Sequence, residues 1–500
     1  MKKLIITLVS TALVVSFLIG FIDVSSPNVK NNDAELIYSV SNIQTDFKAV
    51  GSLDKRSQDI ITATSRGLVK LDENNEIQPS LAESVEVRED GLEYDFKIRS
   101  DIYWSDGTRI TPRDIATFFR EILTEENEEN IAALLNVYGA TVFRGGEGSF
   151  TKDVGISFGE DNIVFRLNSA DDKFIEEMTT PQYRVRKNVL LWEDIQKNYS
   201  DLIYSGYYSI EDMNMSEVSL NRNDKTSSSI AEKIKIISDD GEEIAMASFE
   251  VGGRDIVINP PKSQLGRLNS EGRLISLKSN KTMFLAFNTK EDILQVDGRR
   301  EVYRLINKAF EGYQLGNSIY IELAEGSYFR DDKEDLAKLQ ARKVMSTEEK
   351  EWVEPEVLHI VAEDGSENKE ICEYLSAWFE NNTDIYLVYD LITKDELDSI
   401  DGSNYYDMAI IQGDLTLFNN GSIYNNLLNF LDDSNKEKLS SAKTEGERQE
   451  IFLSIEEDIF NNYRVLPVLF YNDNIAINKK IKNLTMDGNG NIDFSNIEKS

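Results

Sequence analysis

The sequence predicts an α/β protein with more than one lobe. Alternating apolar and polar residues between Ser84 and Leu167 predict antiparallel hairpins, whereas a strand–helix–strand pattern between Val357 and Tyr389 predicts a parallel βαβ unit. The chain has 500 residues and is 40% hydrophobic, which is enough for two or three domains that each bury a core. The two patterns therefore belong to different parts of one multi-lobed chain.

The hairpin-rich part is interrupted by one well-marked helix. The first predicted hairpin turns at Asp90-Gly91, and the second turns between Gly159 and Asn162. Between the two hairpins, Thr111-Pro112-Arg113-Asp114 combines an N-cap residue, a proline at the first helical position and an acid in the first turn. Apolar residues then recur at helical spacing as far as Ile122, so we expect a helix that packs on the hairpins.

The βαβ-rich part predicts a parallel sheet. The expected strands are Val357–Ala362 and Ile385–Tyr389, on either side of a helix around Ile371–Phe379. A further apolar run, Met408–Ile411, predicts another strand and leads into a turn-rich stretch, Gln412–Gly421. We find no internal repeat.

Composition excludes several classes of function. Acidic residues outnumber basic ones by 89 to 54, for a net charge of −35, which would repel nucleic acid. We interpret this charge as a solvated surface. The single cysteine, Cys372, and the single histidine, His359, permit no internal disulfide and no ordinary zinc site. Both lie in apolar patterns, so we expect a buried thiol and a strand residue, with no catalytic residue, metal or cofactor.

The N-terminus has the pattern of an export signal. Lys2 and Lys3 precede the uncharged stretch Leu4–Ile22, which is also about as long as a membrane-spanning helix. No clear cleavage site follows, and no cysteine is available for a lipid anchor. We therefore expect an uncleaved tether, with the remainder of the chain at the outer face of the cytoplasmic membrane.

The order of motifs resembles bacterial extracellular solute-binding protein family 5, the dipeptide- and oligopeptide-binding components of ABC importers. No stretch is specific by itself, because a DG turn between alternating strands occurs in many β proteins; the joint order over nearly the whole exported chain is specific. The stretches are Gly67–Asp72 with Ile77–Ser84, Asp90–Arg99 with Trp104–Thr108 and Thr111–Ile115, Ser205–Tyr208 with Val218–Asn223, Phe284–Thr289 with Arg299–Phe310, and Leu466–Phe470.

The resemblance implies a two-lobed periplasmic-binding-protein-like clamp with mixed sheets and an extra subdomain in the first lobe. The chain would cross between lobes near residues 283 and 470. The implied segments are 1–33 (signal or anchor and linker), 34–66 (lobe 1, first part), 67–200 (extra subdomain), 201–282 (lobe 1, second part), 283–469 (lobe 2) and 470–500 (lobe 1, C-terminal part). Gly91 and Gly107 are interpreted as turn residues, Asp114 as a cap and Trp104 as a core residue.

The function that the resemblance implies is capture of a small solute, above all a peptide, in an interlobe cleft and delivery to ABC permease subunits. No enzyme activity and no nucleic-acid partner are expected, and the protein is expected to be a monomer. A cleft suits a peptide because its walls can satisfy the peptide's backbone N–H and C=O groups. The peptide's ammonium group then needs a carboxylate, since a buried unpaired charge is costly.

The candidate ligand-binding residues are Gly413, Asp414, Phe418 and Asn288. In peptide-binding members the acid lies in a segment that resembles Gly-Trp-x-x-Asp-Tyr. An alignment on Gly413 and Phe418 puts Leu417 in place of that aspartate, and a two-residue slip would let Asp414 supply the carboxylate. The alternatives are a solvated turn acid for Asp414, simple packing for Phe418 and closure of a strand for Asn288.

Three other functions stay open at this point. The same fold could serve as a membrane-tethered sensor without transport, or could bind a non-peptide solute such as a glycan or a metal chelate. A secreted hydrolase would have to use paired carboxylates, and acids are so abundant here that no pair stands out. Neighbouring permease and ATPase genes would distinguish importer from sensor.

Overall fold

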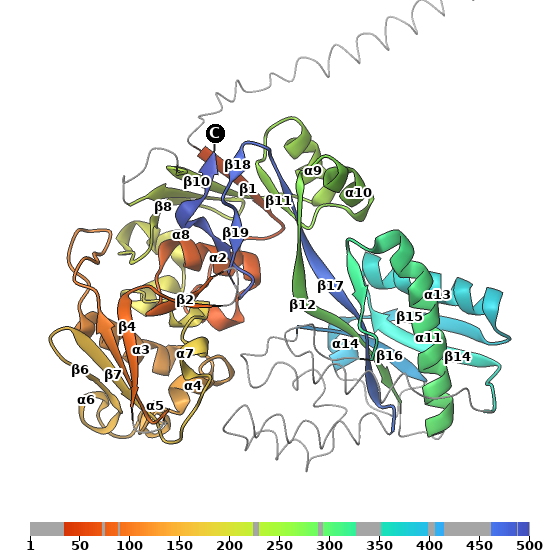
Figure 1. Ribbon diagram of the computed structural model, residues 1–500, viewed down its shortest axis with the longest axis horizontal. Coiled ribbons are helices and arrows are strands. Elements are labelled where there is room, and N and C mark those ends of the chain that lie inside the picture. Colours follow the sequence, from red (N-terminus) through yellow and green to blue (C-terminus); the bar gives the residue numbers. More distant parts are fainter. Residues whose placement is uncertain are drawn as a thin grey trace, which may run out of the picture.

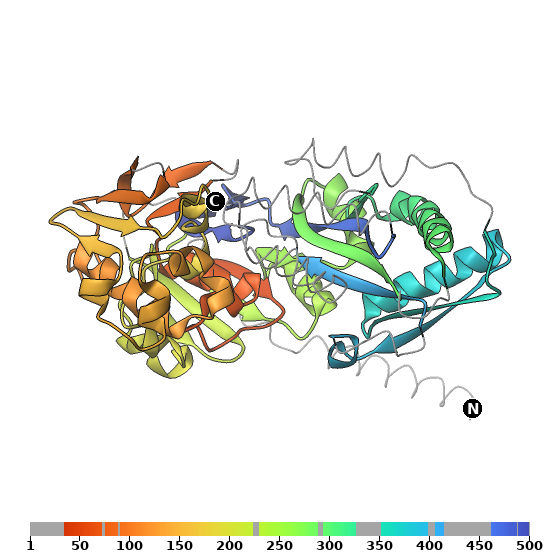
Figure 2. The ribbon, with the colours of Figure 1, turned by 90° about the horizontal axis from the view of Figure 1, so that it is seen from below.

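Two long strands connect the two lobes of the molecule. The computed structural model describes residues 35–72, 76–88, 91–223, 230–288, 294–326, 352–398, 406–414, 462–487 and 489–499. Strands β12 (Leu274–Phe287) and β17 (Val465–Ile477) pair antiparallel and run side by side from one lobe to the other (Figure 1). Figure 2 shows from below that lobe 1 with its subdomain lies at one end of the molecule and lobe 2 at the other.

One mixed sheet extends through both lobes on either side of this pair. Within the described residues its order is β15-β14-β16-β12-β17-β11-β1-β10-β9-β8, with β13 also paired to β17. The strand bounds are β15 Tyr386–Ile392, β14 Val357–Glu363, β16 Met408–Asp414, β13 Ile321–Leu323, β11 Ile256–Ile258, β1 Glu35–Val40, β10 Lys233–Ser238, β9 Glu217–Arg222 and β8 Tyr208–Met213. The mixed sheet confirms the predicted α/β class.

Helices cover the sheet in both lobes. In lobe 2, α13 connects β14 to the parallel strand β15, which confirms the predicted βαβ unit. Within the described residues, the helices of lobe 2 are α11 Val296–Asn317, α13 Ser366–Asn382 and α14 Lys394–Asp398; those of lobe 1 include α2 Lys55–Thr64, α9 Glu242–Glu250 and α10 Lys262–Ser270.

The subdomain is built on a separate four-stranded sheet of order β4-β5-β7-β6. Its elements are β4 Ala82–Arg88, β5 Glu93–Ile98, β6 Ile156–Phe158, β7 Asn162–Arg166, α3 Pro112–Glu125 and the short helices α4 Ala132–Leu135, α5 Ala140–Arg144, α6 Phe150–Asp153 and α7 Phe174–Glu177, followed by α8 Ile195–Asn198. The described residues also form three two-stranded sheets: β2 Val69–Leu71 with β3 Ile77–Pro79, β18 Ile481–Lys482 with β21 Glu498–Lys499, and β19 Thr485–Met486 with β20 Ile492–Asp493.

The turn and cap residues of the subdomain behave as their sequence predicts. Gly91 and Gly107 have φ angles of 91° and 82°, which an L side chain rarely adopts. Thr111 and Asp114 form a complete capping box at the start of α3. Trp104 is buried at 3% exposure, in agreement with the core interpretation.

Strand β16 is longer than the sequence pattern predicts. Gln412, Gly413 and Asp414 were expected to begin a turn-rich stretch, but all three belong to β16. They stay in the strand because their backbones pair with Met283, Thr282 and Lys281 of β12. Pairing with a neighbouring strand therefore outweighs the low strand propensity of glycine and aspartate.

Three main clusters of buried apolar residues divide the molecule. One cluster draws on residues 68–189 of the subdomain, a second on residues 36–63, 192–256 and 475–497 of lobe 1, and a third on residues 283–471 of lobe 2. Independent movement of these parts, and the domain limits expected from the sequence, stay predictions.

A buried network ties the C-terminal segment to α2 of lobe 1. The Asp59 side chain is fully buried and accepts hydrogen bonds from the Tyr38 hydroxyl (2.8 Å), the Ile492 amide (2.9 Å) and the Asn491 side chain (3.2 Å). Its carboxylate also lies 3.4 Å from the Arg56 guanidinium. Burial raises the pKa of Asp59, while Arg56 and the hydrogen bonds oppose that shift.

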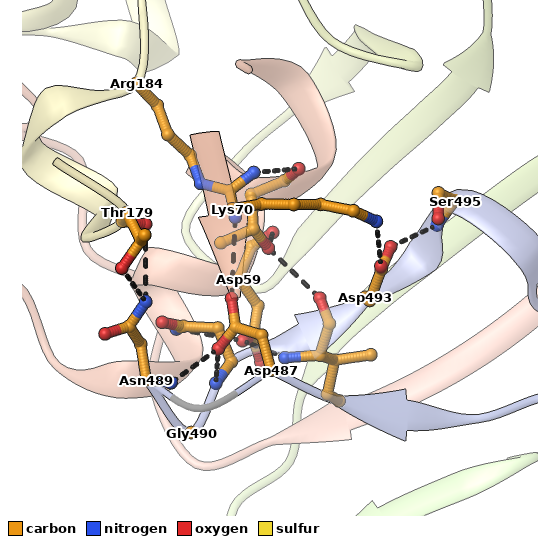
Figure 3. Close-up of polar contacts among 12 residues, drawn as sticks. Asp59, Lys70, Thr179, Arg184, Asp487, Asn489, Gly490, Asp493 and Ser495 are labelled. Atoms are coloured by element: carbon orange, nitrogen blue, oxygen red, sulfur yellow. Dashed lines mark hydrogen bonds and ion pairs between the residues drawn. The ribbon is translucent and has the colours of Figure 1, made fainter. Parts of the chain in front are cut away.

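The same C-terminal segment also contacts the subdomain (Figure 3). Asp487 accepts the backbone N–H groups of Asn489 and Asn491 and pairs with Arg184 of the subdomain at 3.4 Å. The Asn489 side chain donates to the Thr179 carbonyl, and Lys70 pairs with Asp493. The segment thus joins lobe 1 and the subdomain through polar contacts as well as apolar packing.

We predict that Asp59→Ala lowers the free energy of unfolding by about 3–5 kcal/mol, because it leaves the largely buried Arg56 charge without its carboxylate and three buried donors without their acceptor. The urea midpoint measures this loss. Asp161→Ala removes an exposed acid from the β6–β7 turn and should change stability by no more than about 0.5 kcal/mol. Similar midpoints for both variants would contradict the structural role of Asp59.

We also predict that Cys372 resists thiol reagents in the folded protein. Its side chain is fully buried on α13, and burial raises the pKa of its thiol to about 12, so at pH 8 it holds about 1,000-fold less thiolate than a thiol of pKa 9. Labelling with a chromogenic disulfide should be slow in buffer and complete in urea. Rapid labelling of the native chain would show that the helix opens.

Candidate functional site

The parallel strands of the two lobes point their carboxyl ends toward each other. β12 runs from lobe 1 to lobe 2, and β16 is antiparallel to β12, so β16 and its parallel neighbour β14 run back toward lobe 1. β17 runs from lobe 2 to lobe 1, and β11 is antiparallel to β17, so β11 and the parallel strands β1 and β10 run toward lobe 2. The directions of strand pairing alone therefore place the carboxyl ends of the lobe 1 strands opposite the carboxyl ends of the lobe 2 strands.

Ligands of α/β proteins bind outside the carboxyl ends of the parallel strands. On lobe 1 these ends are Val40, Ser238 and Ile258, and on lobe 2 they are Glu363, Ile392 and Asp414. The region between the two edges, beside β12 and β17, is the candidate site.

The structure places two of the predicted site residues at this edge and separates a third from them. Gly413 and Asp414 lie at the carboxyl end of β16. Asn288 follows the far end of β12, six residues beyond Thr282, which pairs with Gly413; at about 3.3 Å per residue it lies about 20 Å away. Phe418 lies outside the described residues.

Asn288 is buried and holds two elements together. Its backbone N–H donates to the Asp407 carbonyl at 2.9 Å, and its side-chain amide donates to the Tyr406 carbonyl at 3.0 Å. These bonds connect the end of β12 to the segment that begins β16. Contact of Asn288 with a ligand stays a prediction.

Apolar packing is interrupted where β12 and β17 pass between the lobes. Within the described residues, the apolar clusters have no member between Leu277 and Met283 on β12, or between Tyr471 and Ile475 on β17. The pairing register also shifts between Lys278 and Thr282. A β-ladder with few apolar contacts and an irregular register bends more easily than the cores on either side.

A polar and aromatic cluster bridges the lobes beside this crossing. Lys262 is the first residue of α10 in lobe 1, and its Nζ lies 3.2 Å from Glu370 Oε2, 3.3 Å from the Tyr313 hydroxyl and 3.9 Å from Glu367 Oε1. The same ammonium lies 4.6 Å from the centre of the Tyr320 ring, a cation–π distance. We call Lys262, Tyr313, Tyr320, Glu367 and Glu370 the interlobe cluster.

Hydrogen bonds orient the acids of the interlobe cluster. The Tyr320 hydroxyl donates to Glu367 at 2.7 Å, and the Tyr313 hydroxyl donates to Glu370 at 2.8 Å. Burial and these carboxylates raise the pKa of both tyrosines well above its ordinary value, so both remain donors. Sequence reasoning missed the cluster, because its members come from three helices and the turn before β13, and no spacing along the chain connects them.

Neighbouring residues connect the interlobe cluster to β16. The Gln412 side chain donates to Asn368 of α13 at 3.1 Å and to the Tyr471 hydroxyl at 3.2 Å. Gln412 directly precedes Gly413, so the cluster lies next to the predicted ligand segment along β16.

Two features are absent from the described residues. No group of three or more His, Cys, Asp and Glu side chains is arranged to hold a metal ion. No helix there is long and apolar enough to cross a membrane. The predicted anchor Leu4–Ile22 lies outside that part of the chain.

The fold and the facing edges define a two-lobed α/β binding protein of the periplasmic type. The family model of bacterial extracellular solute-binding proteins, family 5 (Middle), matches residues 76–311. This match confirms the resemblance that the motif order predicts.

The relatives are distant in sequence and similar over nearly their full length. The oligopeptide-binding protein OppA of Bacillus subtilis is 22% identical over 492 residues, 89% of this chain and 88% of OppA. The murein tripeptide binding protein MppA of Escherichia coli superposes with a TM-score of 0.66 at 16% identity, covering 93% of this chain and 98% of MppA. NikA of Staphylococcus aureus, solved with Ni(L-His)2, gives 0.64 at 15% identity, covering 93% and 100%.

Proposed function

We propose that this protein captures a peptide between its lobes and delivers it to the permease of an ABC importer. The observation that carries the proposal is the opposition of the parallel strand ends of lobe 1 and lobe 2 across β12 and β17. A solute held there contacts both lobes at once, so binding favours the arrangement in which the lobes are closed. The names of the relatives OppA and MppA support a peptide as the solute.

A peptide also suits the chemistry of the proposed site. Strand ends and the loops after them present backbone N–H and C=O groups, which pair with an extended peptide whatever its side chains are. Asp414, at the end of β16, would supply the carboxylate for the peptide's ammonium group. Gly413 beside it has no side chain to block a close backbone approach.

A non-peptide solute is the second candidate. Leu417 stands where peptide-binding members carry their aspartate when the segment is aligned on Gly413 and Phe418. The structural neighbour NikA was solved with a nickel–histidine complex, so a closely similar fold holds a different class of ligand.

The proposed role is binding without chemistry. The family consists of binding proteins. The one histidine, His359, contacts Asp390 on the outer strands of lobe 2, and Cys372 is a buried thiol of raised pKa. Neither has the exposed, activated character of a nucleophile.

The cellular location, the lobe limits and the monomeric state that we propose rest on the sequence. Leu4–Ile22 would hold the protein at the outer face of the cytoplasmic membrane, where permease subunits are the membrane partner. Lobe 2 would extend from about residue 283 to 469 and rotate about β12 and β17, and the protein would act as a monomer.

We predict that the purified full-length chain retains a small ligand. Native mass spectrometry should show an adduct whose mass, released by denaturation, is that of a peptide. A released metal chelate or glycan would favour the second candidate. A chain that carries no adduct, and binds no member of a peptide library, would contradict capture of peptides.

We predict that Asp414→Asn weakens binding of the released peptide by roughly thirty-fold or more. Removing one partner of a buried charge pair typically costs about 2–5 kcal/mol. Isothermal calorimetry measures the change. Asp161→Asn, which removes the same charge from an exposed turn of the subdomain, should bind like the wild type.

An N-acetylated copy of the peptide tests the same contact from the ligand side. It lacks the ammonium group, so it should bind wild type weakly and should discriminate little between wild type and Asp414→Asn. If the free and acetylated peptides bind wild type equally well, no residue anchors the amino terminus, and Asp414 is a solvated acid.

A further inference from the structure

The parallel strands of lobe 1 have a second edge, at their amino ends, opposite the edge that borders the candidate site. Glu35 begins β1 and Val40 ends it, so the two edges are about 17 Å apart at about 3.3 Å per residue. β17 runs toward the amino edge and ends at Ile477, which pairs with Ile256, the first residue of β11. The residues that follow β17 therefore lie on the side of lobe 1 away from the candidate site.

Three exposed lysines follow β17 within a few residues. Lys479, Lys480 and Lys482 are all exposed, whereas Ile481 between them is 5% exposed and belongs to the apolar cluster of lobe 1. Ile481 thus anchors the segment in the core while the lysine side chains remain at the surface. We call Lys479, Lys480 and Lys482 the lysine patch.

Buried contacts hold the lysine patch beside the first residue of β1. The Asp255 carboxylate pairs with the Lys499 ammonium at 2.7 Å, and the two side chains are only 4% and 2% exposed. Lys499 also donates to the Glu35 carbonyl at 2.7 Å and pairs in register with Ile481. Asn478, directly before the patch, donates its N–H to the Asp255 carbonyl at 2.8 Å. The patch is therefore fixed where the chain enters lobe 1.

This entry point is also where the proposed membrane tether would attach. Residues 23–34, twelve in number, separate the predicted anchor Leu4–Ile22 from Glu35, and twelve residues span about 40 Å at most. Figure 1 shows β1, β18 and the C-terminus at the top of lobe 1, with the subdomain at the bottom. A chain anchored through Leu4–Ile22 thus keeps the lysine patch within reach of the bilayer.

Charge distinguishes the lysine patch from the chain as a whole. The net charge of −35 repels the protein from an anionic bilayer. Near the patch, the acids are Glu35 and Glu498, which pairs in register with Lys482. Three lysines against these two acids leave a local excess of positive charge. Each lysine also carries its charge on a longer stem than glutamate does, so the ammonium groups reach a surface first.

We propose that the lysine patch contacts anionic lipid head groups and holds lobe 1 with the amino edge of its strands toward the membrane. The inference rests on the proposed function, since the tether supplies the local concentration. Within a Debye length of an anionic surface, each lysine favours contact by about fivefold, and the tether makes the contact intramolecular. The edge that borders the candidate site is then turned away from the bilayer, toward solutes outside.

Energy transfer to the bilayer measures this orientation in the full-length chain. A donor dye is placed on Asn496→Cys, an exposed position two residues before β21, or on Val142→Cys in the subdomain, which is 55% exposed. The buried Cys372 does not compete for the dye. The acceptor dye is carried by lipid head groups, in vesicles of zwitterionic lipid alone or with about a third of anionic lipid.

We expect anionic lipid to raise energy transfer from Asn496→Cys and to lower it from Val142→Cys. Salt at about 1 M, which shortens the Debye length to about 3 Å, should abolish both changes. Replacing the lysine patch by three glutamines should reduce the ratio of patch-facing to other orientations by about tenfold or more, because each lysine contributes about fivefold and the two acids oppose them.

The matched control removes the same charge from three exposed lysines on β5, α8 and α13. These are Lys97, Lys197 and Lys369. The control variant should respond to anionic lipid as the wild type does, because the three lysines lie on separate elements away from the entry point. Equal energy transfer with both lipids in the wild type, or an equal loss in the two triple variants, would overturn the lysine patch.

Flotation of the same vesicles tests the tether separately from the patch. Both triple variants should float with zwitterionic vesicles, since the anchor does not depend on surface lysines. A wild-type chain that does not float is not anchored, and that result would overturn the tether and the patch together. Neither readout uses a solute, so failure of the lysine patch is distinct from failure of solute capture, which calorimetry with the peptide reports.

Discussion

The antiparallel pairing of β12 with β17 is the constraint on which the rest of the molecule depends. Because the two strands run in opposite directions, each lobe adds its parallel strands antiparallel to one of them, and both sets of strands must then run toward the junction. The carboxyl ends that bind ligands in α/β proteins are thereby brought face to face. A single strand pair thus serves as both the connection between the lobes and the origin of the site.

The kind of contact at each junction indicates which parts move together. The subdomain and lobe 1 are joined by charged side chains with little exposure, Asp487 and Arg184, and separating such groups from their partners is costly. Lobe 2 contacts lobe 1 through a polar stretch of ladder and a partly exposed lysine. We infer that the subdomain moves with lobe 1, and that lobe 2 rotates against both.

This division explains how one architecture can serve several ligands. On the proposed function, rotation of the lobes would depend on the crossing strands, whereas recognition would depend on residues at and after the strand ends, such as Gly413 and Asp414. Changes at the strand ends can alter the ligand without altering the hinge. On this proposal, the departure of this chain from the peptide-binding motif would be a change of that kind.

The sequence by itself determined the local structure and the family resemblance. Alternation between Ser84 and Leu167, the capping box at Thr111 and the βαβ pattern after Val357 depend on neighbours in the chain, so periodicity and cap chemistry predict them. Tertiary structure alone decided three things: that β16 continues through Gly413, that Asn288 lies far from Gly413, and that Lys262 meets Glu370. Each depends on which strands or helices become neighbours, and contacts between residues distant in sequence leave no spacing that a single sequence reveals.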